Sequence, residues 1–450
     1  MPRLILAPLF LLTASSAGYV AAQQPLPLSQ SVEAQLPALV ETYKDFHRHP
    51  ELSHHEEQTS GKLADDLRKL GYQVTERVGL YRDGANVSKA WGIVALLENG
   101  PGPRLLIRTD MDALPVEEKT GADYASHVQS TNAEGQPTGV MHACGHDIHM
   151  TVLLGTAKEL VARKSQWHGT VMLIGQPSEE TIDGSRAMLA DHLYDRFGKP
   201  DFVLAEHDDS TLAAGDVGIK GGPLLASSTS IDVIMRGIGT HGPHPNGGKD
   251  PILMAAEFVV LAQGIISRQI DAQQPAVLTV GTIHGGLKRN IIPEEVTMGI
   301  TLRTYSDAVR DQIIAAIRRT ADGVAVAYGM PADRMPIVNV SQTEITPATI
   351  NDPAFAERLR KVAIAILGAQ HVAVGEAVMG SEDVGLFSLN GTIPAVMFRL
   401  GASDPAKLAE SVKTGVPLPG PHSPLFAPVY GPTIRTGVTS LTAMALDILK

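Results

Sequence analysis

The chain has 450 residues, and 44% of them are hydrophobic, which is enough to fill the cores of two or three domains. Its formal net charge is −11, and no block of lysine or arginine interrupts that acidity. This charge argues against nucleic-acid binding, because a phosphate backbone demands clustered positive charge. Cys144 is the only cysteine, so an internal disulfide is excluded.

The N-terminus has the pattern of a signal peptide. Arg3 supplies a positive start, residues 4–12 form an apolar run, and residues 20–22 (VAA) resemble a small-residue cleavage site. The run is shorter than the ~20 residues that span a bilayer. We therefore expect a signal peptide over residues 1–22, cleavage near Ala22, export to the periplasm or the medium, and no membrane span in the mature chain.

The segments that follow alternate between helical and strand patterns. Helical periodicity is typical of residues 31–49, 57–70 and 148–162. Short apolar runs predict strands at residues 91–97, 104–108, 170–175 and 202–205. This alternation predicts an α/β fold with helices on both faces of a sheet.

A second unit is predicted to interrupt this fold. Its segments read strand 230–236, helix 250–268, strands 276–283 and 295–304, and helix 308–326, an order close to a ferredoxin-like half-unit. We predict a first catalytic part at 23–222, an inserted α+β domain at 223–335, and a second catalytic part at 336–450. The last part carries a helix at 353–367, a strand at 394–400 and a helix at 434–449.

Residues 141–149 (MHACGHDIH) concentrate potential metal ligands. They hold three histidines, an acid and the only cysteine, and thiolate, imidazole and carboxylate are the groups that bind transition metals. A buried, inert cysteine remains an equal alternative for this segment alone. Three predicted strands run into further candidates: Asp110 and Asp112, Glu179 and Glu180, and Glu206 and His207. Because sites in open α/β sheets form at the carboxyl ends of strands, this convergence favours a metal centre.

A metal centre with spare carboxylates suits amide hydrolysis. A metal lowers the pKa of a bound water toward ~7, and two metals ~3.5–4 Å apart clamp the tetrahedral intermediate. A carboxylate that is not a ligand must then move the water's proton to the leaving amine. Glu179 and Glu180 suit this division, since neighbours in an extended segment point in opposite directions.

Six stretches resemble the M20 metallopeptidases, and within them the branch of hippurate hydrolases, N-acyl-amino-acid hydrolases and auxin-conjugate hydrolases. The resemblance implies a mixed-sheet metallohydrolase domain with an inserted lid that also mediates dimerisation. The stretches run in the family's order over nearly the whole mature chain: 108–115 (RTDMDALP), 141–147 (MHACGHD), 176–180 (QPSEE), 285–293 (GGLKRNIIP), 379–383 (MGSED) and 422–424 (HSP).

The resemblance also implies residue roles. Cys144 matches a thiolate that bridges two metals; His146 and His207 match the remaining ligands of one metal, and Glu180 and His422 those of the other. Glu179 matches the catalytic base, and Asp112 an acid that orients a ligand. The lid residues match as well: His241 steadies the oxyanion in the partner subunit's site, and Asn290 and Arg303 bind the substrate. The two divalent ions are expected to be Zn or Mn, with Co or Ni as further options.

The function expected from these residues is an amidohydrolase for N-acyl amino acids or small peptide-like amides. A dipeptidase or carboxypeptidase of the same family, an inactive metal-binding protein, and a cysteine hydrolase built on Cys144 are the alternatives. Two departures from the family pattern stand out: Ile148 replaces a small residue, and the stretch Asp208-Asp209 after His207 is unusually acidic.

Overall fold

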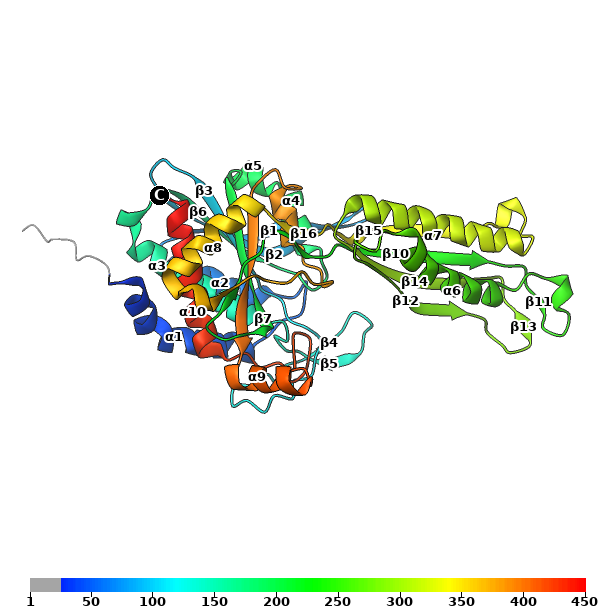
Figure 1. Cartoon of the computed structure of the whole chain (residues 1–450), viewed down its shortest axis with the longest axis horizontal. Helices are drawn as coiled ribbons and strands as arrows, with labels where there is room; N and C mark the ends of the chain where they lie inside the picture. Colours follow the sequence, from blue (N-terminus) through cyan, green and yellow to red (C-terminus); the bar gives the residue numbers. More distant parts are fainter. Residues whose placement is uncertain (1–25) are drawn as a thin grey trace, which may run out of the picture.

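The computed structural model describes residues 26–450, which form a main lobe and an elongated small lobe joined by two chain crossings (Figure 1). The predicted signal peptide, residues 1–22, lies outside the described residues. The small lobe comprises residues 228–346, and the main lobe comprises the described residues on either side of it.

An eight-stranded mixed sheet runs through the main lobe in the order β1-β2-β6-β3-β7-β18-β8-β17. Strands β6, β3, β7 and β18 are mutually parallel, whereas β1, β2 and β6 pair antiparallel. Strand β6, between β2 and β3, is buried along its whole length, as expected for a strand covered on both faces of the sheet. The bounds are β1 Gln73–Asp83, β2 Asn86–Asn99, β3 Arg104–Asp110, β6 Gly169–Gln176, β7 Phe202–Ala213, β8 Val217–Gly218, β17 Val372–Ala373 and β18 Ala395–Ser403.

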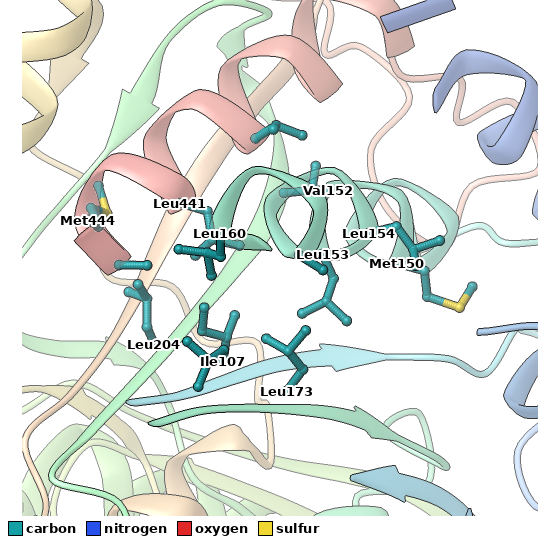
Figure 2. Close-up of a cluster of buried hydrophobic side chains, with 14 of the residues drawn as sticks. Ile107, Met150, Val152, Leu153, Leu154, Leu160, Leu173, Leu204, Leu441 and Met444 are labelled. Carbon is teal, nitrogen blue, oxygen red and sulfur yellow. The ribbon is translucent and has the colours of Figure 1, made fainter. Parts of the chain in front are cut away.

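One face of this sheet carries the largest core. Helix α3 (His146–Ala162) is buried on nearly all sides, between the strands and helices α1 (Leu28–Arg48) and α10 (Tyr430–Ile448). Figure 2 shows Leu153 and Leu160 of α3 directed at Ile107, Leu173 and Leu204 of the sheet. This packing fixes the N-terminus of α3 at the carboxyl ends of the strands. The same face holds α2 (Glu57–Lys69) and α8 (Pro353–Leu367), and the opposite face holds α4 (Gly184–Ala190) and α5 (Leu193–Phe197).

The small lobe is an antiparallel sheet in the order β12-β14-β10-β15, with two long helices and a core of its own. Its chain order, β10-α6-β12-β14-α7-β15, completes the ferredoxin-like βαββαβ pattern. The elements are β10 Ser228–Arg236, α6 Pro251–Gln269, β12 Ala276–Gly285, β14 Glu295–Thr304, α7 Asp307–Ala327 and β15 Ile337–Thr346. The last strand lies beyond residue 335, the expected end of the insert, because Val338 and Val340 pack against the small-lobe core.

The remaining elements are short or peripheral. They are β4 Gln129–Thr131, β5 Pro137–Gly139, β9 Gly222–Leu225, β11 Thr240–His241, β13 Ile291–Ile292, β16 Thr349–Asn351 and α9 Pro405–Thr414. Among the described helices, α6 alone is long and apolar enough to cross a membrane by length and composition. Its buried residues, such as Phe258 and Ile265, pack on the small-lobe sheet, which accounts for that composition within a folded domain.

Candidate metal centre

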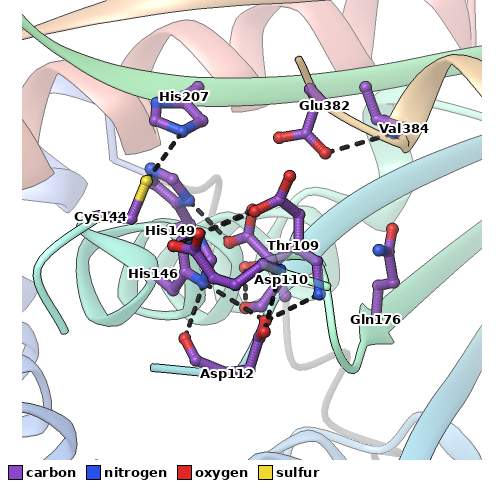
Figure 3. Close-up of polar contacts among 12 residues, drawn as sticks. Thr109, Asp110, Asp112, Cys144, His146, His149, Gln176, His207, Glu382 and Val384 are labelled. Atoms are coloured by element: carbon purple, nitrogen blue, oxygen red, sulfur yellow. Dashed lines mark hydrogen bonds and ion pairs between the residues drawn. The ribbon is translucent and has the colours of Figure 1, made fainter. Parts of the chain in front are cut away.

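The predicted ligands of the main lobe gather beside the N-terminus of α3 and the strands β3, β6 and β7, with His422 reaching them from the loop after α9. Figure 3 shows Cys144, His146 and His207 with Asp112. Gly145 makes this approach possible, since it caps α3 in the left-handed conformation, with φ of 79°. A Cβ at this position would lie 2.4 Å from the Asp208 carboxylate, so both backbone and space demand glycine. One expectation needs correction: β7 continues to Ala213, so Glu206 and His207 lie within that strand rather than after it.

Five candidate ligands fall into two groups that share Cys144. Cys144, His146 and His207 are buried, and their ligand atoms all lie within 4.8 Å of one another; the same limit holds for Cys144, Glu180 and His422. The Cys144 Sγ lies 3.6 Å from His207 Nε2, and the Glu180 carboxylate lies 3.4 Å from His422 Nε2. This arrangement suits two ions with one thiolate between them.

Backbone carbonyls set the tautomers of the two buried histidines. His146 Nδ1 lies 2.7 Å from the carbonyl oxygen of Asp112, and His207 Nδ1 lies 2.7 Å from the carbonyl oxygen of Asp208. Each Nδ1 therefore donates, which leaves Nε2 of both rings as a lone-pair donor directed at the cluster. A metal ligand requires this orientation of the ring.

Two buried polar atoms without hydrogen bonds indicate whether the cluster suits cations. His146 Nε2 and Glu180 Oε1 are buried and form no hydrogen bond within the described part of the chain. Buried polar atoms in proteins nearly always form hydrogen bonds. These two atoms face each other at 3.8 Å without one, which indicates a site for a bound cation. The donor set of thiol, imidazole and carboxylate is that of a transition-metal site.

The pKa values of the acidic groups in the cluster also indicate a site for cations. Burial, reinforced by Glu382 and Glu180, raises the pKa of Glu179 well above its usual range. Burial raises the pKa of Glu180 to about 8, and burial together with Glu180 and Glu179 raises that of the Cys144 thiol. Bound cations reverse these shifts and favour the thiolate and carboxylate forms. The raised thiol pKa also argues against a cysteine nucleophile, which needs a lowered one.

Asp112 organises the turn that carries the paired glutamates. Its two carboxylate oxygens accept the backbone N–H groups of Glu179 and Glu180, both at 3.0 Å, and Ser53 donates to it at 2.6 Å. Glu179 Oε2 lies 3.8 Å from His146 Nε2, so its carboxylate faces the cluster beside the candidate ligand Glu180.

A buried ion-pair network beneath the cluster was not anticipated from the sequence. Arg108 is fully buried and donates to Asp110 at 2.5 Å, Glu382 at 2.6 Å and Gln176 at 2.9 Å. Asp110 in turn accepts from His149 Nδ1 at 2.7 Å. The sequence did hold a clue to this network: the stretches 108–115 and 379–383 place charged residues in or beside buried segments, and a buried charge needs a partner of opposite charge.

The three predicted small-lobe residues do not join the centre within one chain. His241 and Asn290 are exposed on and beside β11 and β13, which Figure 1 shows at the end of the small lobe farthest from the main lobe. Arg303 is half-buried and donates to the hydroxyl of Ser381 in the main lobe. A single chain therefore brings together Cys144, His146, Glu179, Glu180, His207, His422 and Asp112 only.

Comparisons with known proteins assign the chain to a family. The profile of peptidase family M20/M25/M40 matches residues 106–415, more than half of the sequence. The chain belongs to this family. It is 34% identical over 371 residues to thermostable carboxypeptidase 2 of Saccharolobus solfataricus, covering 82% of this chain and 87% of that one. It is 32% identical over 349 residues to N-acetylcysteine deacetylase of Bacillus subtilis, covering 78% and 84%.

A solved structure supports the same assignment. The Bacillus subtilis YxeP protein, described as a dinuclear metal-binding peptidase of family M20, superposes with a TM-score of 0.73 at 26% identity, covering 93% of this chain and 99% of that one. The family resemblance expected from the sequence is thus confirmed, as is the α/β fold class. The chain is a metal-dependent hydrolase of amide bonds.

Proposed function

We propose that this protein is an exported amidohydrolase that uses two divalent cations to cleave N-acyl amino acids. One observation carries the proposal: Glu179 is a buried carboxylate that faces the ligand cluster and lies close to His146 and Glu180, while the two groups that share Cys144 do not include it. A protein that only stores or carries metal needs no such carboxylate.

Two cations held by Cys144, His146, His207, Glu180 and His422 would activate a water molecule and polarise the scissile carbonyl. Glu179 accepts the proton from that water as the oxygen attacks the carbonyl carbon. Glu179 then delivers the same proton to the nitrogen of the leaving amine, and the C–N bond breaks. Asp112 holds the Glu179–Glu180 turn in place through its two N–H contacts.

The donor set guides the choice of metal. A central thiolate with two imidazoles favours zinc, while the carboxylate of Glu180 also admits manganese, with cobalt or nickel as substitutes. Exhaustive chelation is expected to abolish hydrolysis, and single-metal reconstitution to restore it. Full activity after verified metal removal would contradict the mechanism.

The substrate class follows from the relatives and from the small lobe. N-acetylcysteine deacetylase supports an N-acyl amino acid, and the guanidinium of Arg303 suits a substrate carboxylate. Thermostable carboxypeptidase 2 favours the second candidate, a carboxypeptidase or dipeptidase. A hydrolysis screen of N-acetyl and N-benzoyl amino acids against free-amine dipeptides, repeated with zinc, manganese and cobalt, separates the two. Preferential turnover of dipeptides would replace the amidohydrolase proposal.

We further propose that the small lobe forms a homodimer and completes the site of a second copy. Its helix α6 exposes Ile252, Leu253, Val260 and Leu261, each between 45% and 72% exposed, and such a contiguous apolar face is typical of an interface. Strand β12 pairs with β14 alone in the described sheet, so its outer edge is open to a partner strand. In such a dimer His241 and Asn290 of one copy reach the substrate of the other.

Subunit mixing tests this arrangement. A Glu179→Gln chain lacks its base, and a His241→Ala chain lacks its oxyanion contact, so each homodimer is inactive. Random re-association yields about half heterodimers, each with one intact site, and therefore about a quarter of wild-type activity. A mixture no more active than its components would contradict a shared site, and a mass measurement under the same conditions reports the dimer independently.

A further inference from the structure

Three consecutive backbone amides of the turn before α4 point at carboxylates. The N–H of Ser178 donates to Glu56 Oε1 at 2.7 Å, and the N–H groups of Glu179 and Glu180 donate to the two oxygens of Asp112 at 3.0 Å. Asp112 thus holds two of the three amides, and Glu56, which lies just before α2, holds the third. The proposed base sits in the middle of this run.

Ser178 needs this support because of its backbone. Its φ of 52° places it in the left-handed region, which side chains other than glycine rarely adopt. The residue immediately follows Pro177 and precedes Glu179, so its backbone conformation sets the direction in which Glu179 leaves strand β6. Loss of the contact that stabilises this conformation would redirect the base.

Glu56 is buried, and one of its carboxylate oxygens accepts several hydrogen bonds. It is completely buried, and its Oε1 accepts from the Ser178 N–H, from the Ser178 hydroxyl at 2.9 Å and from the His54 N–H at 3.0 Å. The single hydroxyl proton of Ser178 is donated to Glu56, so the Tyr81 hydroxyl, at 2.6 Å, donates to the Ser178 oxygen. The second carboxylate oxygen of Glu56, Oε2, is buried and has no hydrogen-bond partner in the described residues. An isolated buried carboxyl with all its contacts through one oxygen is costly, which argues that this oxygen has a specific task.

We propose that Glu56 is a positioning residue that holds Ser178 in its left-handed conformation and thereby directs the Glu179 carboxylate at the reacting water. The inference rests on the proposed role of Glu179 as base. Glu56 belongs to neither group of candidate metal ligands that shares Cys144, so we expect its effect on rate to pass through the turn. Substitution of Glu56 therefore distinguishes the effect of base placement from the effect of cation binding.

The test compares Glu56→Ala with Glu56→Gln and with the neighbouring, exposed Glu57→Gln as a matched control. Glu56→Ala removes all three acceptor contacts, and we expect kcat to fall about 10- to 100-fold, the range for residues that orient groups at a metal site. KM is expected to stay within about threefold, with both cations retained. Glu56→Gln keeps an acceptor at the Oε1 position and is expected to recover most of kcat, whereas Glu57→Gln leaves it unchanged.

Hydrogen–deuterium exchange of the metal-free protein gives a readout independent of activity. Glu56→Ala should accelerate exchange in the peptide that carries amides 178–180 while leaving peptides from α3 unchanged. A kcat within threefold of wild type, or a loss of bound metal in parallel with kcat, would overturn the proposal. If the wild-type protein hydrolyses no tested amide, the proposed function fails, and exchange at 178–180 then decides alone: local acceleration retains the positioning role, and none refutes it.

Discussion

The substitution Glu179→Gln isolates the proton transfer from every other property of the centre. The glutamine side chain keeps the size of glutamate, and the backbone N–H of residue 179 still donates to Asp112 at 3.0 Å. The two ligand groups that share Cys144 do not include Glu179, so the metal content should stay at the wild-type value. The variant can neither accept the proton of the water nor return it to the amine.

The expected magnitude follows from the two roles that the side chain combines. General acid–base catalysis contributes typically ~10²–10⁴-fold, and a group that acts in both directions belongs in the upper part of that range. We therefore expect kcat to fall by more than ~10³-fold, which corresponds to about 4 kcal/mol in the activation barrier. The assay is steady-state hydrolysis of the best amide from the screen, with metal content measured on the same preparation. A kcat within tenfold of wild type, with two cations bound, would refute the role of Glu179.

Three further outcomes test the centre and its surroundings. Cys144→Ala should lose both cations, since Cys144 belongs to both ligand groups, whereas His146→Ala should weaken mainly one; equal stoichiometry by mass spectrometry would contradict the bridging thiolate. Gly145→Ala should lower the free energy of unfolding by at least ~1–2 kcal/mol, because its left-handed backbone penalises a Cβ, and an unchanged Tm would contradict this. Burial lowers the pKa of His47, but its contacts with Asp147 and Glu118 outweigh that effect and raise it from 6.5 to about 9. The stabilisation is thus complete below pH 6.5 and lost as pH rises through about 9, so the advantage of wild type over His47→Gln in urea unfolding should shrink by about 3 kcal/mol between pH 6 and 10; a constant difference would contradict it.

Local pattern predicted most of the main lobe. The helices at 57–69 and 146–162 and the strand at 169–176 lie within two residues of the expected bounds. Apolar content marks these segments, and Gly71 and Gly145, both in the left-handed region, mark the end of one helix and the start of the other. Strand β1 was missed, since Gln73–Asp83 carries few apolar residues and two irregularities in its pairing with β2. Strand β15 was missed for a related reason: six of its ten residues are polar, and its place is set by pairing with β10.

In the candidate site, too, some residues were predicted from the sequence and others were not. Residue type and the strand-end pattern pointed to Asp112, Glu179 and Glu180, and the family resemblance implied the full ligand set. His207 lies within β7 and His422 in the loop after α9, so the ends of the observed strands alone would not have given them. Supporting residues were harder to find. Glu56 looks like any surface acid in the sequence, and only the three-dimensional packing brings it, from 123 residues before Glu179, against the turn at Ser178. Glu382 lies in a stretch that matched the family, but its hydrogen bond with Arg108 appears only in the structure.

The departure at Asp208 has a physical consequence for the centre. Asp208 is buried, and although its carboxylate forms no hydrogen bond in the described part of the chain, it lies 3.3 Å from His207 Nδ1 and 3.4 Å from His149 Nε2. A carboxylate behind an imidazole increases the basicity of the opposite ring nitrogen, which here is the Nε2 directed at Cys144. The added acid thus strengthens the group formed by Cys144, His146 and His207 relative to that formed by Cys144, Glu180 and His422. Because His422 is also the most exposed of the five candidate ligands, we expect a cation held by Cys144, Glu180 and His422 to exchange with solvent more readily than one held by Cys144, His146 and His207.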